Sequence, residues 1–261
     1  MFRLTIACLL ALGICTGSQA GTVKLEGRSL MVEVDETTGR WTLLDKRSRT
    51  RWPSKEMANP GAATWLEGGV QKTETLDKTS VRLHWKNGAA VIFALAEEGD
   101  ALEIRYDGKA DSPVRVLDDA LAITDIEGGY AIVPCREGLL APADSGKAFK
   151  RVFGTSDYEG CHMNMLGFVK AGSALIVTWD NAYVFPELQS TRPSDKRYSQ
   201  RLTTTLELRR SANSLRLMPL GQGDFNTVAE GYRHYAEKQG LVATLQEKIN
   251  RDPHVELMIG A

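Results

Sequence analysis

Two loop-like segments of the sequence gather side chains that can hold a hydroxyl-rich ligand. The first, Cys135-Arg136-Glu137, follows a strand-like run that ends at Pro134. The second crowds hydrogen-bonding side chains into residues 157–164: Asp157, Tyr158, Glu159, His162 and Asn164. Aromatic faces pack against C–H patches, and planar polar side chains exchange hydrogen bonds with hydroxyl groups. The candidate binding residues are therefore Arg136, Glu137, Tyr158, His162 and Asn164. The alternative for Arg136 and Glu137 is a solvated surface pair.

Trp179 and Asp180 form a third candidate, because they stand at the end of another strand-like run. A tryptophan in such a run is more often part of the core than a binding platform. The other tryptophans beside strand-like runs are expected in the core: Trp41, Trp65 and Trp85. Trp52 precedes Pro53 in a polar stretch, which leaves open an exposed stacking role.

No motif assigns a catalytic residue, a metal or a cofactor. The histidines are scattered, without a His-x-x-x-His spacing or a neighbouring cysteine pair, so no zinc site is expected. The sequence also lacks a Gly-x-Ser-x-Gly elbow and a phosphate-binding Gly-Lys-Ser/Thr loop. Side chains suited to general acid and base catalysis are present but unassigned: His84, His162, Glu137 and Asp180.

The composition is that of a globular protein without a polyanion partner. The chain has 261 residues, of which 43% are hydrophobic and 25% are charged, so it can build a core. It has 32 basic and 33 acidic residues, a formal net charge of −1. Such a balance favours binding neither to nucleic acid nor to an anionic membrane.

Residues 1–20 are predicted to be a secretory signal peptide. A short basic start precedes an apolar run over 4–14, and Ser18-Gln19-Ala20 places small residues before a cleavage point at Gly21. The apolar run is shorter than a spanning helix, so no membrane attachment is expected after cleavage. The sequence therefore predicts a secreted or periplasmic protein.

Cleavage would leave two cysteines, Cys135 and Cys161. In an exported protein they can form one disulfide, and the alternative is two separate buried thiols. Because each cysteine lies in one of the candidate loops, a bridge would hold those loops together.

The elements that must position these loops are strands. Between residues 23 and 220 the apolar residues recur with period two, as in Leu30, Val32 and Val34 or in Leu102, Ile104 and Tyr106. Glycine-containing turn signals separate the runs. Many short strands with frequent turns predict a mainly β fold, an antiparallel supersandwich over residues 21–223.

The pattern changes to helical spacing in residues 224–261. Phe225 to Ala236 predict one amphipathic helix, with Asn226 as a cap and Gly240 at its end. Thr244 and Glu247 have the spacing of a capping box for a second helix that stops near Asp252-Pro253. Residues 254–261 are predicted to be a mostly buried strand, the first of a truncated (β/α) barrel. The alternative is a terminal strand that returns to an edge of the β domain.

Several segments carry a family resemblance. Residues 231–233 and 245–261 resemble the junction between two domains in secreted glycoside hydrolases related to endo-α-N-acetylgalactosaminidases. Residues 129–140 and 165–177 are similar to upstream segments of the same group, and residues 35–45 resemble its opening hairpin. These enzymes share a galactose-mutarotase-like supersandwich ahead of a catalytic TIM barrel.

The resemblance implies a carbohydrate partner, an oligosaccharide or a glycoconjugate, and a second partner in the remainder of the chain's own barrel. Glycoside hydrolysis uses two carboxyl groups, which in such barrels stand at the ends of later strands. The catalytic residues are therefore expected beyond Ala261. Two alternatives stay open: a stand-alone mutarotase or epimerase, and a non-catalytic carbohydrate-binding module of the cell envelope.

Overall fold

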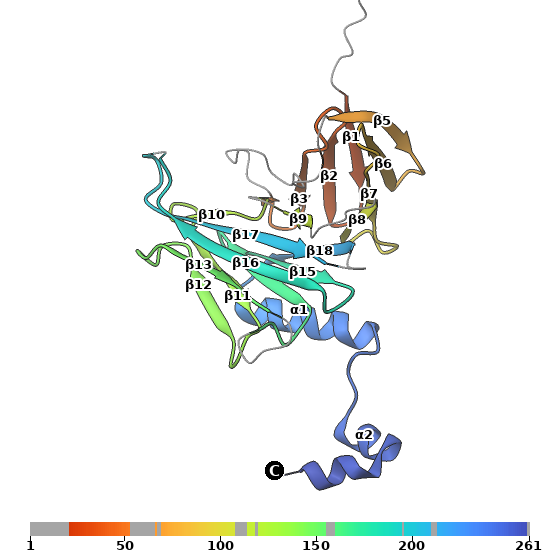
Figure 1. Ribbon diagram of the computed structural model, residues 1–261, viewed down its shortest axis with the longest axis vertical. Coiled ribbons are helices and arrows are strands. Elements are labelled where there is room, and N and C mark those ends of the chain that lie inside the picture. The colour runs from red at the N-terminus through yellow and green to blue at the C-terminus, as the bar shows by residue number, and fades with distance from the viewer. Residues whose placement is uncertain are drawn as a thin grey trace, which may run out of the picture.

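The computed structural model describes residues 21–52, 66, 69–107, 114–117, 120–154, 160–194, 196–209 and 213–259. These residues form eighteen strands, two α-helices and one 3₁₀ helix (Figure 1). The strand pairs are antiparallel, which confirms the predicted fold class. The predicted signal peptide, Tyr158 and Trp65 lie outside the described residues.

The largest sheet has nine strands, in the order β12-β11-β14-β15-β18-β8-β7-β6-β5. Their bounds are β5 Val70–Thr75, β6 Ser80–Trp85, β7 Ala90–Leu95, β8 Leu102–Asp107, β11 Gly129–Val133, β12 Leu139–Pro142, β14 Met165–Lys170, β15 Ser173–Trp179 and β18 Ser214–Gln222. Strand β8 pairs with β18, so that Leu102 lies opposite Leu217. This long-range pairing joins two distant parts of the sequence into one continuous sheet.

Two smaller sheets cover this large sheet (Figure 1). One contains β1 Thr22–Glu26, β2 Leu30–Asp35, β3 Trp41–Asp45 and β4 Arg51–Trp52. The other contains β9 Val114–Val116, β10 Ile123–Thr124, β13 Phe149–Val152, β16 Val184–Thr191 and β17 Arg201–Leu208. Strand β1 contacts β7, whereas β10 contacts β11. The smaller sheets therefore pack on different halves of the large one, as in a supersandwich.

The core lies between these sheets and follows the alternation read from the sequence. Leu30, Val32 and Val34 of β2 are buried, as are Leu102 and Ile104 of β8. They belong to a single hydrophobic cluster that includes residues of all three sheets. Burial of alternate apolar residues thus selects the face that each strand turns inward.

Helix α1, Phe225–Lys238, covers the outer face of the large sheet over β14, β15 and β18 (Figure 1). Two glycines allow this close approach. A Cβ atom on Gly167 would lie 2.5 Å from Cγ1 of Val228, and one on Gly231 would lie 2.8 Å from Cδ1 of Leu220. The cap is Asp224 rather than the predicted Asn226, because its carboxylate accepts from the first-turn N–H groups. The predicted role of Gly240 is confirmed by its φ of +66° after the helix end.

The predicted second helix is confirmed, but the predicted terminal strand is wrong. Helix α2, Leu245–Arg251, begins with the Thr244–Glu247 capping box. Residues 253–258 then form a 3₁₀ helix, η1 Pro253–Met258, in place of the first barrel strand. Leu257 and Met258 are 79% and 73% exposed. A strand needs hydrogen-bonding neighbours, whereas the 3₁₀ turn satisfies its backbone locally after the Asp252 cap and a proline at its start.

Trp52 is not an exposed stacking residue. Its side chain is 0% exposed, and the ammonium of Lys170 lies 4.4 Å from its ring centroid. Lys170 is itself buried, donates to the carbonyl of Arg51 at 2.8 Å, and lies 3.8 Å from a carboxylate oxygen of Glu127. The polar stretch around Trp52 is therefore compatible with burial because a neighbouring cation covers the ring.

Replacing Lys170 by methionine is expected to change how stability depends on pH. Burial lowers the pKa of Lys170 below 10.5, while the charge of Glu127 acts in the opposite direction. As pH rises from the folded pKa towards 10.5, the unfolded chain binds this proton and the folded chain does not, so stability rises. Lys170→Met should lack this rise in urea denaturation measured over that range. A constant difference between the two proteins would contradict the assignment, and Lys72→Met, whose side chain is 67% exposed, is the control.

Candidate functional site

Backbone hydrogen bonds bring the sequence-predicted segments together. The N–H of His162 donates to the carbonyl of Pro134 at 2.8 Å, which joins the loop before β14 to the turn after β11. The N–H of Trp179 donates to the carbonyl of Asn164 at 3.3 Å, which joins the same loop to the end of β15. The three candidate segments therefore lie along one end of neighbouring strands.

The side chains of these segments do not converge on one pocket. Arg136, Glu137, His162 and Asp180 are exposed, and Asn164 is half-buried. Trp179 is 4% exposed and belongs to the core between the sheets, and together with Asp180 it borders a cavity of about 180 Å³. The predicted binding roles of these residues, and of Tyr158, stay predictions.

The two cysteines are free buried thiols, which is the second of the two alternatives that the sequence left open. Burial raises the pKa of the Cys161 thiol to about 12, and neighbouring Cys135 acts in the same direction. The loops that carry them are held together by the backbone contact between His162 and Pro134 without a covalent link.

An apolar groove lies on one flank of α1. It has a volume of about 580 Å³ and runs over β11, β12 and β14. Glu137 and Met163 line it from the predicted loops, and Phe225, Val228 and Tyr232 line it from α1. Glu137 is the only one of the sequence-predicted polar side chains that reaches this described groove, which offers few hydrogen-bonding groups.

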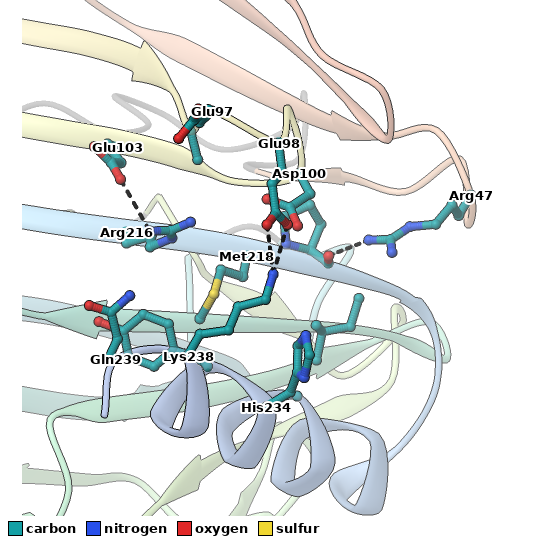
Figure 2. Close-up of a pocket in the computed structure, with 15 residues that line it drawn as sticks. Arg47, Glu97, Glu98, Asp100, Glu103, Arg216, Met218, His234, Lys238 and Gln239 are labelled. Atoms are coloured by element: carbon teal, nitrogen blue, oxygen red, sulfur yellow. Dashed lines mark hydrogen bonds and ion pairs between the residues drawn. The ribbon is translucent and has the colours of Figure 1, made fainter. Parts of the chain in front are cut away.

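A polar cleft of about 480 Å³ lies on the opposite flank of α1, over β18 and the start of β8 (Figure 2). Two ion pairs cross it. The ammonium of Lys238 lies 2.8 Å from both carboxylate oxygens of Glu98, and Arg216 Nη1 donates to Glu103 Oε1 at 3.2 Å. Further hydrogen-bonding side chains line the cleft: Arg47, Glu97, Asp100, His234, Tyr235 and Gln239.

The ion pair with Lys238 favours the ionised form of Glu98 in the polar cleft. The ammonium of Lys238 lowers the pKa of Glu98 below its usual value through a hydrogen bond and its charge. Glu98 is therefore ionised at neutral pH and faces its partner. Such a carboxylate accepts hydrogen bonds but is poorly suited to donate a proton.

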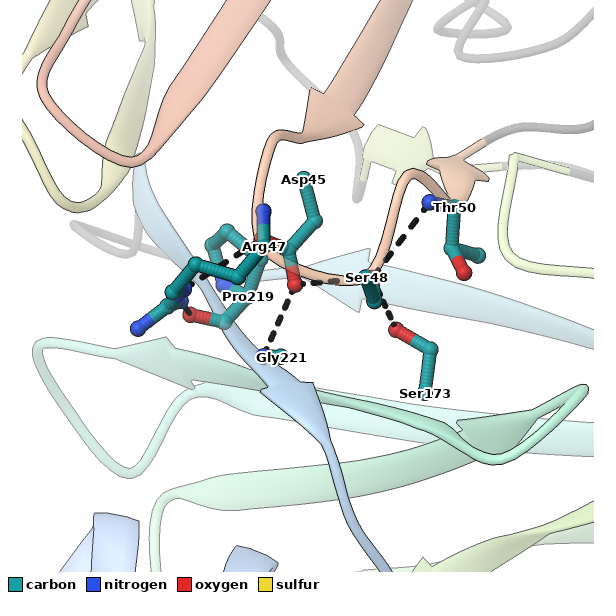
Figure 3. A network of polar contacts seen from close by, with 7 residues as sticks. All are labelled: Asp45, Arg47, Ser48, Thr50, Ser173, Pro219 and Gly221. Carbon is teal, nitrogen blue, oxygen red and sulfur yellow. Dashed lines mark hydrogen bonds and ion pairs between the residues drawn. The ribbon is translucent and has the colours of Figure 1, made fainter.

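Arg47 reaches the polar cleft from a turn that is fixed by the buried carboxylate of Asp45 (Figure 3). Asp45 Oδ1 accepts from the backbone N–H and Nε of Arg47 at 3.0 and 3.3 Å, and its Oδ2 accepts from the N–H of Gly221 at 2.8 Å. Arg47 also donates to the carbonyl of Pro219. Ser48 joins Asp45 to Ser173 on β15. The network thus fastens the β3–β4 turn to β15 and β18.

Sequence reasoning missed the polar cleft, although one signal was present. Gly231, His234, Tyr235 and Lys238 follow helical spacing on a face adjacent to the apolar face of α1. The opposite wall comes from the β7–β8 turn and β8, more than a hundred residues earlier in the chain. Only the β8–β18 pairing brings that wall to the helix.

The described residues contain no cluster of three or more His, Cys, Asp or Glu side chains suited to a metal ion. In the same part of the chain, no helix has the length and apolar character needed to cross a bilayer.

Comparisons with known proteins show the fold. No family model and no curated protein matches the chain. Among solved structures, the α-N-acetylgalactosaminidase NagBb from Bifidobacterium bifidum matches 89% of the chain, with a TM-score of 0.62 and 15% identity for a quadruple mutant. Its complex with GalNAc has a TM-score of 0.62 and 16% identity, and its ligand-free form has 0.63 and 14%. The matched region is 41% of the NagBb chain, so this protein spans about two fifths of that length. The described residues therefore have the fold of part of a glycoside hydrolase.

Proposed function

We propose that this chain is the carbohydrate-associated β-sandwich region of a secreted glycoside hydrolase, one that supports a catalytic (β/α) barrel. The observation that carries the proposal is the fold match to two fifths of an α-N-acetylgalactosaminidase. In this proposal residues 1–20 direct export, residues 21–223 form the β domain, and residues 224–261 lead towards the barrel.

The state of the carboxylates supports a binding role over a hydrolytic one. Glu98 and Glu103 each face a cation, and the pKa of Glu98 is lowered. A glycosidase needs one carboxylic acid with a raised pKa to protonate the leaving oxygen. The proposal therefore assigns hydrolysis to residues outside the described cleft.

A non-catalytic carbohydrate-binding module is the second candidate function. The polar cleft supports this function as well as it supports the first. The stand-alone mutarotase has less support. His84 on β6 pairs with Glu74 of the edge strand β5 at 3.4 Å, far along the sheet from the loops of Glu137 and His162.

Hydrolysis and ring-opening assays separate these functions. The 261-residue chain should cleave none of a panel of nitrophenyl glycosides, including the α-N-acetylgalactosaminide, and should not accelerate anomer exchange measured by NMR. The product of the complete reading frame of the same gene should cleave at least one glycoside. If that product is inactive on every glycoside, the assignment to a hydrolase is wrong, and binding without turnover would support the module instead.

A further inference from the structure

The polar cleft continues into two adjoining cavities on the outer face of the large sheet. Glu103 lines all three spaces. One cavity of about 180 Å³ shares Arg216 and Tyr235 with the cleft and is also lined by Thr178 and Asp180. The other, of about 240 Å³, extends over β8, β7 and β6. We refer to the cleft and both cavities together as the Glu103 groove.

Strand register places the central side chains of the Glu103 groove in one row. Thr178 of β15 lies opposite Arg216 of β18, and Arg216 lies opposite Glu103 of β8. Ile176, two residues before Thr178, packs with Val228 of α1, so this row is on the helix-covered face. The guanidinium of Arg216 lies 5.9 Å from the ring centroid of Tyr235. The row thus presents a hydroxyl, an ion pair and an aromatic ring across three strands and a helix.

Two polar atoms in this row have no hydrogen-bond partner among the described residues. Thr178 is 1% exposed, and its Oγ1 is buried and unpaired. Arg216 donates through Nη1 to Glu103, but its Nε is buried and unpaired. Buried polar groups are usually satisfied, so unpaired ones beside a cavity indicate a partner that occupies it.

The charges of the groove indicate a neutral partner. The Arg and Lys side chains that line the groove are matched by an equal number of carboxylates: Arg47, Arg82, Arg105, Arg216 and Lys238 against Glu97, Glu98, Asp100, Glu103 and Asp180. Arg216 and Lys238 are each paired with a carboxylate, at 3.2 and 2.8 Å. Paired charges still offer several directed donors and acceptors, which suit hydroxyl groups. Tyr235 is half-buried and adds an aromatic surface for a sugar ring.

We propose that the Glu103 groove binds a neutral oligosaccharide of more than one ring, with Thr178, Arg216 and Tyr235 as contact residues. The class of ligand, a saccharide, rests on the proposed function. The length and the neutral charge of the ligand rest on the size and the charges of the groove. The cleft alone has the volume of an ordinary small-ligand site, and its continuation gives room for further rings.

A glycan array tests the proposal with the 261-residue chain. The array carries neutral glycans of one to six rings, with sialylated and sulfated forms of the same glycans. We expect binding to neutral glycans that strengthens from one ring to at least three, with no preference for the charged forms. Binding to no glycan, equal binding at every length, or preference for the anionic forms would each overturn the proposal.

Point variants locate the binding in the groove. Thr178→Val keeps the shape and removes a hydroxyl that has no partner in the free chain, so it should leave thermal stability unchanged or higher and weaken calorimetric binding about 5-fold. Tyr235→Ala should weaken binding about 10-fold, whereas Tyr235→Phe should retain it. Arg233→Met, on the other flank of α1, is the matched control. Unchanged affinity in both Thr178→Val and Tyr235→Ala would place the ligand elsewhere.

The results distinguish a failure of this inference from a failure of the proposed function. A gene product that hydrolyses glycosides while the groove variants bind normally would retain the proposed function and overturn the inference. An inactive gene product whose glycan binding depends on the groove would overturn the proposed function and retain the inference.

Discussion

Replacing Asp45 by alanine is expected to lower the free energy of unfolding by about 3 kcal/mol, measured by urea denaturation. The carboxylate is 0% exposed and accepts hydrogen bonds from the N–H of Gly221, from Arg47 and from Ser48. Its removal leaves the Gly221 N–H buried without an acceptor and releases the turn that carries Arg47. The substitution removes several hydrogen bonds at once. Hydrogen bonds to a charged group contribute more to stability than those between neutral groups.

Asp77→Ala is the matched control for Asp45→Ala. Asp77 also accepts from backbone and hydroxyl groups, Thr79 N and Oγ1, but it lies in an exposed turn. Asp77→Ala should therefore lower the free energy of unfolding much less than Asp45→Ala does. Equal denaturation midpoints for wild type and Asp45→Ala would show that the network in Figure 3 does not fasten the sheets together.

The Cys161 thiol is expected to react with iodoacetamide about 1,000-fold more slowly in the folded chain than in the unfolded chain at pH 8. Burial raises the pKa of this thiol from 9.0 to about 12, so the reactive thiolate is correspondingly rare. Alkylation followed by mass spectrometry of the peptide containing Cys161 measures the rate. The same protein in urea is the control, and similar rates in both states would contradict the burial.

The same shift predicts a loss of stability at alkaline pH. Between pH 9.0 and about 12 the unfolded chain has released the Cys161 proton and the folded chain has not, so stability falls as pH rises. The expected slope is about 1.4 kcal/mol per pH unit. Lys170 acts in the opposite direction below pH 10.5, so the slope is measured as the difference between wild type and Cys161→Ala.

Local sequence patterns predict several of the elements. Alternation predicts β2, β6, β8, β17 and β18, and the capping box of Thr244 and Glu247 predicts the start of α2. Local pattern failed for residues 254–259, because an apolar run specifies burial only when neighbouring strands are present. It also left Trp52 ambiguous, because the cation that covers its ring comes from Lys170, 118 positions later in the sequence.

The candidate site divided in the same way. The turn after Pro134 and the loop around His162 were predicted as binding loops from their residue types, and the fold places them side by side. Of the residues that line the Glu103 groove, the sequence indicated Trp179 and Asp180 as candidates. The other lining residues were not recognised, because in sequence they look like an ordinary charged surface. That the Thr178 hydroxyl is unpaired and that Arg216 is paired with Glu103 depends on the neighbouring strands, which the local sequence does not specify.

By itself the sequence determined that the chain is mainly β, which faces of several strands are buried and where helix α2 begins, because these depend on neighbours within a few positions. The tertiary structure alone decided that β8 pairs with β18, that Asp45 fastens the sheets, and that α1 forms one wall of a polar groove. The physical reason is that these contacts join residues more than a hundred positions apart, whose pairing depends on which sheet faces meet and not on any local periodicity.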